Sequence, residues 1–256
     1  MPASPAIHTS LLYGFLLVLT RVAGIFTFLP LPGFKAGPDT AKITLAFALT
    51  FALYARWPNV VPPSNIVELA GWMLAEAAIG TAIGLAVSFL IEAVVMAAQA
   101  ISTQAGYSFA STIDPNTEAD ATVLIVFAQL IGAILFFAMG LDRQLLAILA
   151  RSFETNPPGV FAVSQPAAEA LAMLGSGIFI TGLRLALPLM ALLFLIDLTV
   201  GLLGRLNGQL QLIALAFPAK MLAAVAGLTV LVLLIPKLYQ QSAAAAFGVL
   251  GKLLGW

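Results

Sequence analysis

The stretch EAAIGTAIGLAVSFLIE, from Glu76 to Glu92, places a charged or small residue at every fourth position of an otherwise apolar run. Residues at that spacing lie on one face of an α-helix. Glycine there lets a second helix backbone approach closely, and helix association in lipid depends on such contacts. The stretch therefore predicts a membrane helix that packs along one face against a neighbour whose identity the spacing leaves open. The pattern consists of Glu76, Gly80, Gly84, Ser88 and Glu92.

The composition of the whole chain is that of an all-α integral membrane protein. Its 256 residues are 61% hydrophobic and 9% charged, whereas soluble domains carry about 25% charged residues. Eleven bases balance eleven acids, so nothing suggests nucleic-acid binding. The absence of cysteine excludes disulfides, thiol catalysis and thiolate metal sites. The first apolar run contains Arg21 and follows no basic segment, so we expect a retained helix and not a cleavable signal.

Apolar segments alternate with proline-marked breaks, since proline ends or kinks a helix. A spanning helix needs about 20 apolar residues. By that measure the second segment is short, and the third and fourth merge with Glu92 at their join. The pattern predicts about six long apolar helices in kinked hairpins. The segments are Leu11–Leu29, Ile43–Ala55, Ile66–Ile91, Val94–Ile113, Thr122–Leu149, Gly177–Leu203 and Leu212–Ile235.

The loop charges do not orient these helices. With alternating spans, five basic residues fall on the side of the N-terminus and four on the other, and this difference is too small to decide an orientation. Two interpretations stay open: an ordinary multispan protein oriented by its partners, or hairpins that do not cross a bilayer in the usual way. The first group is Arg56, Arg143, Arg151, Lys237 and Lys252, and the second is Lys35, Lys42, Arg205 and Lys220.

Four charges lie inside apolar runs: Arg21, Glu76, Arg184 and Asp197. Each costs about 2.5–3.5 kcal/mol at a bilayer centre, so we expect them to face protein or water. Arg184 and Asp197 are too far apart to pair within one straight helix, and Pro188 predicts a kink between them. A broken-helix transport site is one interpretation. Contact with partner subunits is the other, and the one we favour.

The sequence offers little for catalysis. The only histidine, His8, precedes the first apolar run, and no Gly-x-Ser-x-Gly elbow occurs. Asp142 and Asp197 lack the Gly-x-Gly-Asp setting of an intramembrane aspartyl protease. No phosphate loop or metal-spaced cluster is present. We expect no enzyme activity, no cofactor and no metal.

The segment QAGYSFASTIDPNTEAD, Gln104 to Asp120, is rich in turn and hydroxyl residues and lies between two apolar runs without any Lys or Arg. Non-helical backbone at membrane depth is tolerated only where it is buried in protein or lines a cavity. Gly106 permits a tight bend, while Phe109 and Ile113 supply bulk that could exclude water. From these residues alone the segment is either a surface turn or a constriction.

Four segments together resemble the flagellar biosynthetic protein FliR family, whose virulence counterpart is the SctT subunit of injectisomes. The resemblance covers nearly the whole chain and is most specific in the last segment. The chain departs from the family's usual pattern at Gly140-Leu141-Asp142 and at Gly208. The segments are RVAGIFTFLPLPGF (21–34), QAGYSFASTIDP (104–115), LFFAMGLDRQLLAILARSFETNPPG (135–159) and LRLALPLMALLFLIDLTVGLLGRLNGQLQLIALAFPAK (183–220).

This resemblance implies a subunit of the flagellar type III protein export gate in the bacterial inner membrane, at the flagellar basal body. The partners implied are FliP-like, FliQ-like, FlhB-like and FlhA-like subunits and unfolded export substrates. Within one membrane domain, 1–176 would be FliP-like and 177–256 a FliQ-like hairpin. The alternatives are an injectisome export-gate subunit, or a small secondary transporter or channel subunit that works without such partners.

The resemblance also assigns the residues of a channel plug loop. A channel plug loop would consist of Gly106, Tyr107, Ser108, Phe109, Ala110, Ser111, Thr112, Ile113, Asp114 and Pro115. Many relatives have a second aromatic residue at the position of Thr112, so the seal would depend on Phe109 and Ile113. Helix packing or partner contact is expected at Glu76, Gly80, Gly84, Ser88, Glu92, Arg184, Pro188, Asp197, Arg205, Gln209 and Gln211.

Overall fold

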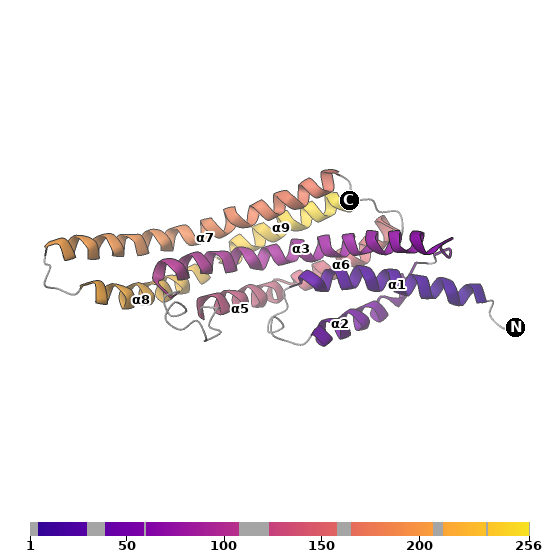
Figure 1. Cartoon of the computed structure of the whole chain (residues 1–256), viewed down its shortest axis with the longest axis horizontal. Coiled ribbons are helices and arrows are strands. Elements are labelled where there is room, and N and C mark those ends of the chain that lie inside the picture. Colours follow the sequence, from indigo (N-terminus) through magenta and orange to yellow (C-terminus); the bar gives the residue numbers. More distant parts are fainter. Residues whose placement is uncertain are drawn as a thin grey trace. The chain divides into compact units, whose positions relative to one another are not determined.

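The computed structural model describes residues 5–29, 39–58, 60–107, 123–157, 165–206, 212–233 and 235–255, and these ranges contain helices and no strand (Figure 1). The predicted all-α class is confirmed. The helices are α1 (Pro5–Phe28), α2 (Asp39–Ala52), α3 (Ile66–Ala105), α5 (Val123–Ala138), α6 (Leu141–Thr155), α7 (Gln165–Leu206), α8 (Leu212–Val232) and α9 (Ile235–Leu253), with a short 3-10 helix η1 (Tyr54–Arg56).

The chain divides into two compact units that interleave along the sequence. The first unit comprises Met1–Phe89, Phe136–Gly175 and Ala243–Trp256, and the second comprises Leu90–Leu135 and Ser176–Ser242. Helices α3, α5, α7 and α9 each pass from one unit into the other. The division into a FliP-like part and a FliQ-like hairpin concerns likeness to other folds and stays a prediction.

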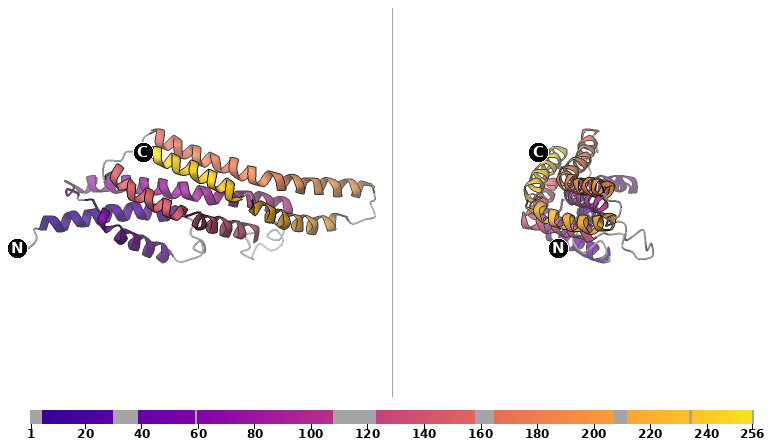
Figure 2. Two further views of the ribbon diagram at one scale, coloured as in Figure 1. Left: turned by 180° about the vertical axis from the view of Figure 1, so that it is seen from behind. Right: turned by 90° about the vertical axis from the view of Figure 1, so that its left-hand side faces the viewer.

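In the first unit, α1 lies beside the N-terminal half of α3 (Figures 1 and 2). Leu17 of α1, Ile83 of α3 and Leu149 of α6 are almost fully buried in its core. A cluster of aromatic rings joins α1 to α2, with the Phe15 ring centred 5.3 Å from that of Trp57. The Trp57 indole Nε1 donates a hydrogen bond to the Thr50 carbonyl oxygen at 2.9 Å, which fixes the turn after α2.

In the second unit, α8 returns beside the C-terminal part of α7 (Figure 1). Helix α7 also packs closely on α3, because a Cβ atom added at Gly182 would lie 3.1 Å from the Ala93 carbonyl oxygen. Helix α5 approaches α3 in the same manner at Gly132, where an added Cβ would lie 3.2 Å from Ile91. Small residues thus set the helix spacing in this unit, as expected for helices that associate in lipid.

Among the residues that the structure describes, three helices are long and apolar enough to cross a membrane: Thr9–Phe28, Ile66–Ala105 and Ala172–Leu206. Up to five spans result if each of two bent helix pairs is one span. The predicted segments Ile66–Ile91 and Val94–Ile113 form one helix as far as Ala105, with Glu92 in its interior. Helix α3 is therefore continuous over 40 residues.

Two features differ from the segment boundaries expected from the sequence. The apolar segment Thr122–Leu149 is not one helix: it breaks at Gly140, whose φ of +67° suits glycine, and α6 begins at the next residue. Helix α9 begins where the last predicted segment ends. It was not predicted from hydropathy because its apolar residues are mixed with Lys237, Lys252 and two glutamines. Both helices are less uniformly apolar than the others, which explains why hydropathy alone does not delimit them.

Candidate functional site

The small-residue face of α3 packs directly on the backbone of α1. A Cβ atom added at Gly80 would overlap the Arg21 carbonyl oxygen. One added at Gly84 would lie 2.6 Å from the Ile25 carbonyl oxygen. From the other side, a Cβ added at Gly24 would lie 2.9 Å from the Ala77 carbonyl oxygen. The neighbour that the glycine spacing left unidentified is, in this structure, the first helix of the same chain.

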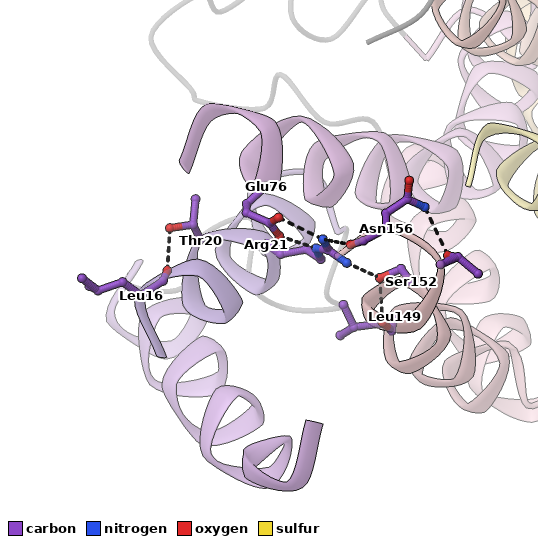
Figure 3. A network of polar contacts seen from close by, with 8 residues as sticks. Leu16, Thr20, Arg21, Glu76, Leu149, Ser152 and Asn156 are labelled. Carbon is purple, nitrogen blue, oxygen red and sulfur yellow. Dashed lines mark hydrogen bonds and ion pairs between the residues drawn. The ribbon is translucent and has the colours of Figure 1, made fainter. Parts of the chain in front are cut away.

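Next to this contact, Arg21 of α1 forms a bidentate ion pair with Glu76 of α3 (Figure 3). The Arg21 Nε lies 2.5 Å from Glu76 Oε2, and Nη2 lies 3.0 Å from Oε1. Neither side chain has any exposed surface. Because two parallel hydrogen bonds match the planar guanidinium to the carboxylate, the pair also fixes the relative register of the two helices.

The remaining donors of Arg21 reach α6 and the residue after it (Figure 3). Nη1 donates to Ser152 Oγ at 2.9 Å, and Nη2 donates to the Asn156 carbonyl oxygen at 2.9 Å. The Phe153 ring lies with its centroid 4.3 Å from the guanidinium carbon, a cation–π distance. One buried arginine therefore joins α1, α3 and α6, and all three of its nitrogens are used.

A second polar cluster lies in the second unit and is centred on Asp197 of α7. Lys220 Nζ of α8 lies 2.8 Å from Asp197 Oδ1, and Gln104 Nε2 of α3 donates to Oδ2 at 3.2 Å. The Lys220 side chain is 11% exposed and that of Asp197 is 38% exposed. Unlike Arg21 and Glu76, the Asp197 carboxylate is only partly buried by this chain, so loss of its partner would leave a less deeply buried charge.

The end of α3 is anchored on α8 just beyond this cluster. Gly106 has φ +89°, a conformation suited to glycine, and a Cβ there would lie 2.9 Å from the Phe217 ring. The Tyr107 hydroxyl donates to the Met221 carbonyl oxygen at 3.1 Å. These contacts fix the direction in which the chain leaves α3. The other plug-loop residues lie outside the described residues: Ser108, Phe109, Ala110, Ser111, Thr112, Ile113, Asp114 and Pro115.

The other residues assigned to packing or partner contact are distributed along α3 and α7. Ser88 is buried, and its hydroxyl donates to the Leu85 carbonyl oxygen at 3.0 Å. Glu92 is half-buried. On α7, Arg184, Pro188 and Arg205 are exposed, Pro188 lies inside the helix, and the kink expected there stays a prediction. Gln209 and Gln211 lie outside the described residues.

Several partners in these clusters were not singled out from the sequence. Ser152 and Asn156 are ordinary polar residues at the end of an amphipathic helix, and only their distance to Arg21 reveals their role. Lys220 was expected among the loop charges, but it lies within α8 and is largely buried. The sequence did offer one sign that Lys220 is more than a loop charge: it ends the Phe-Pro-x-Lys motif in the most family-specific segment. In the described part of the chain, no three His, Cys, Asp or Glu residues gather as a metal site.

The fold and these clusters define a helical membrane protein whose buried charges are used to hold its own helices together. Residues 12–246 match the family described as bacterial export proteins, family 1. The chain is 31% identical over 238 residues to the flagellar biosynthetic protein FliR of Escherichia coli (strain K12), covering 92% of this chain and 90% of that protein.

Other relatives have the same name. The FliR protein of Pectobacterium carotovorum subsp. carotovorum is 30% identical over 236 residues, which cover 91% of this chain and 90% of that protein. The FliR protein of Bacillus subtilis (strain 168) is 29% identical over 211 residues, which cover 80% of this chain and 81% of that protein. The chain belongs to the FliR family of bacterial export proteins, and the resemblance found in its motifs is confirmed.

Proposed function

We propose that the chain is the FliR-type subunit of a flagellar type III protein export gate. The observation that carries the proposal is the extent of the family match, which covers residues 12–246. The Escherichia coli relative is matched over nine-tenths of its own length, so the likeness is not confined to one motif. All of the relatives compared above are flagellar proteins, which favours the flagellar setting over the injectisome.

In this proposal the protein acts as a structural subunit and not as an enzyme. It resides in the bacterial inner membrane at the flagellar basal body and assembles with FliP-like and FliQ-like subunits, next to FlhB-like and FlhA-like ones. The exposed apolar surface of α7 supports such an assembly, because only 22% of its most apolar stretch is buried by this chain. A surface of that kind requires lipid or other subunits to cover it.

We also propose that the loop from Gly106 to Pro115 closes the channel through which unfolded flagellar proteins pass. The anchoring of its first residues supports this role. Gly106 packs against Phe217, and Tyr107 is hydrogen-bonded to Met221, so the loop starts from a fixed point on α8. Hydrophobic constrictions gate by dewetting, and a fixed base would hold such a constriction at one place.

Deletion of the gene in its native host tests the proposed function. We expect loss of swimming and loss of secreted flagellar proteins from the culture medium, both restored by a plasmid copy of the chain. The intracellular levels of the same flagellar proteins serve as a control, since export and not synthesis should fail. Normal motility and secretion in the deletion strain would contradict the proposal, and loss of an injectisome's secreted proteins alone would assign the chain to that system.

A further inference from the structure

A cavity of about 420 Å³ lies inside the second unit and has no role in the proposed export function. Its volume is within the range of about 300–1,000 Å³ that is typical of small-molecule sites. Its walls come from the C-terminal half of α3, from α5, α7 and α8, and from the start of α9. Representative lining residues are Ala97, Ile101, Ala128, Ile131, Leu185 and Leu228.

The walls offer almost nothing for a polar ligand. Among the residues described as lining the cavity, Tyr107 and Thr229 are the ones with polar side chains, and both hydroxyl protons are already used. Tyr107 donates to the Met221 carbonyl oxygen and Thr229 to the Val225 carbonyl oxygen, each at 3.1 Å. A water molecule in a protein needs about 2–4 polar partners. The cavity is therefore too apolar to retain ordered water.

An empty space of this size would also be unfavourable. Side chains around a void lose dispersion contacts on one side, because no atoms face them. Smaller dry cavities, of about 150 Å³, bind benzene or xenon when lined by aliphatic residues. A ligand with hydrogen-bonding groups inside the cavity would leave those groups unpaired. The occupant that fits this lining is hydrocarbon.

The cavity has an apolar mouth through which hydrocarbon could enter. Three of its apolar lining residues are also exposed: Phe127 by 57%, Val225 by 49% and Val232 by 40%. Two of the helices that form its walls, α3 and α7, are long and apolar enough to cross a membrane. The solvent around such helices is the acyl region of the bilayer, so the most abundant hydrocarbon at the mouth is a lipid tail.

We propose that this cavity binds one acyl tail of a membrane phospholipid, with the head group remaining outside the mouth. The tail would fill the space between α3, α5 and α8. It would hold these helices together with dispersion contacts that the chain does not supply itself. This role is distinct from export through the channel, although Tyr107 at the start of the plug loop forms part of the cavity wall.

Photocrosslinking in the assembled complex tests the proposal. The full chain, purified with its partner subunits, is placed in nanodiscs containing phosphatidylcholine with a diazirine near the end of one acyl chain. After irradiation, peptides that contain Ala97, Ile101 or Ala128 should carry the label. Ala128→Phe should reduce this labelling by about fivefold or more, because the ring occupies the space of the tail. Ala97→Phe, which fills the cavity from α3 in place of α5, should reduce the labelling as well. Agreement of the two variants would show that the loss is not caused by misfolding of one of them.

The matched control is Ile134→Phe. Ile134 lies on the same helix as Ala128, is 64% exposed and does not line the cavity, so labelling of the cavity peptides should be unchanged. Label confined to exposed residues such as Ile134 would overturn the proposal. So would labelling by a diazirine-bearing decane but not by the phospholipid, since the occupant would then be a free hydrocarbon. Labelling of the isolated chain that disappears in the complex would assign the cavity to a partner subunit instead.

Discussion

Arg21 and Glu76, 55 positions apart in the chain, form a fully buried bidentate ion pair between α1 and α3. Buried pairs are not in themselves strongly stabilising, because desolvation offsets most of the Coulomb attraction. Loss of one partner is nevertheless costly, because it leaves the other charge buried and uncompensated. In this protein the pair also reaches Ser152 in α6, so three helices depend on a single guanidinium group.

Replacing Arg21 alone should be severely destabilising. Arg21→Met leaves the Glu76 carboxylate buried without its counter-charge, and we expect a loss of about 3–5 kcal/mol in the free energy of unfolding. Thermal unfolding of the purified protein and its abundance in membranes measure this loss. Arg143→Met, at an exposed arginine of α6, should have little effect. Because paired apolar replacement is often neutral, Arg21→Met with Glu76→Met should recover most of the stability. A double variant as unstable as the single one would contradict this account of the pair.

The glycine contact between α1 and α3 predicts a position-specific effect of one methyl group. Gly80→Ala should displace α1 and cost at least about 1–3 kcal/mol, the usual range for overpacking, because the added Cβ meets backbone that cannot rotate away. Gly71→Ala, in the same helix with nothing within 4 Å of the added atom, should be neutral or slightly stabilising. Unfolding temperatures of the two variants provide the comparison, and equal shifts would refute the contact.

Larger substitutions on the same face should abolish function. Gly80→Leu or Gly84→Leu should prevent assembly and swimming, since a branched side chain has no space against the α1 backbone at Arg21 or at Ile25. Leu85→Ile keeps the volume and lies off this face, so motility should remain close to that of the unchanged protein. Swimming-plate diameters and the yield of purified complex measure both outcomes. Motile Gly84→Leu cells would show that α1 and α3 tolerate separation.

The Asp197 cluster predicts a smaller change than the Arg21 pair. Lys220→Met removes the ammonium from Asp197, but the carboxylate keeps its hydrogen bond from Gln104 and is not fully buried by this chain. We expect a loss of about 1–2 kcal/mol, below the range for a fully buried pair, because the carboxylate keeps one hydrogen-bond donor. Lys237→Met, at an exposed lysine of α9, is the control in the same unfolding assay. A loss as large as that of Arg21→Met would mean that the assembly buries Asp197 more deeply.

The plug assignment predicts a leak without disassembly. Phe109→Ala combined with Ile113→Ala should make cells permeable to small solutes, while the complex still purifies intact, because the loop and not the helices would provide the seal. Thr112→Phe in that background should reduce the leak by restoring aromatic bulk. Dye or ion uptake measures permeability. A tight membrane around an intact double-variant complex would refute the plug, even with family membership unchanged.

The helical class and the long α3 helix could be predicted from the sequence, because composition and small-residue spacing are local properties. The break at Gly140 and the helix α9 could not be delimited in this way. At Gly140 a single positive-φ residue interrupts a continuous apolar run. In α9 the apolar residues are mixed with Lys237, Lys252 and glutamines, so hydropathy falls although the helix continues.

The candidate site shows a similar division. The sequence indicated that Arg21, Glu76 and Asp197 need partners, since a charge in an apolar run is costly. It could not pair Arg21 with Glu76 or Asp197 with Lys220, because partner choice depends on which helices the tertiary fold brings together. The spacing of Gly80 and Gly84 likewise predicted a closely packed helix, but only the structure identified that helix as α1.

The native mass of the complex extracted from the host's membranes tests the central claim most directly. A FliR-type gate subunit should elute in one defined assembly together with FliP-like and FliQ-like subunits, identified by mass spectrometry of the same fraction. Expressed without them, the chain should aggregate or be degraded, because the surface of α7 that carries the exposed Arg184 would face lipid in place of the partner subunits. A stable, monodisperse monomer that elutes without these subunits, both in the host and when expressed alone, would contradict the account.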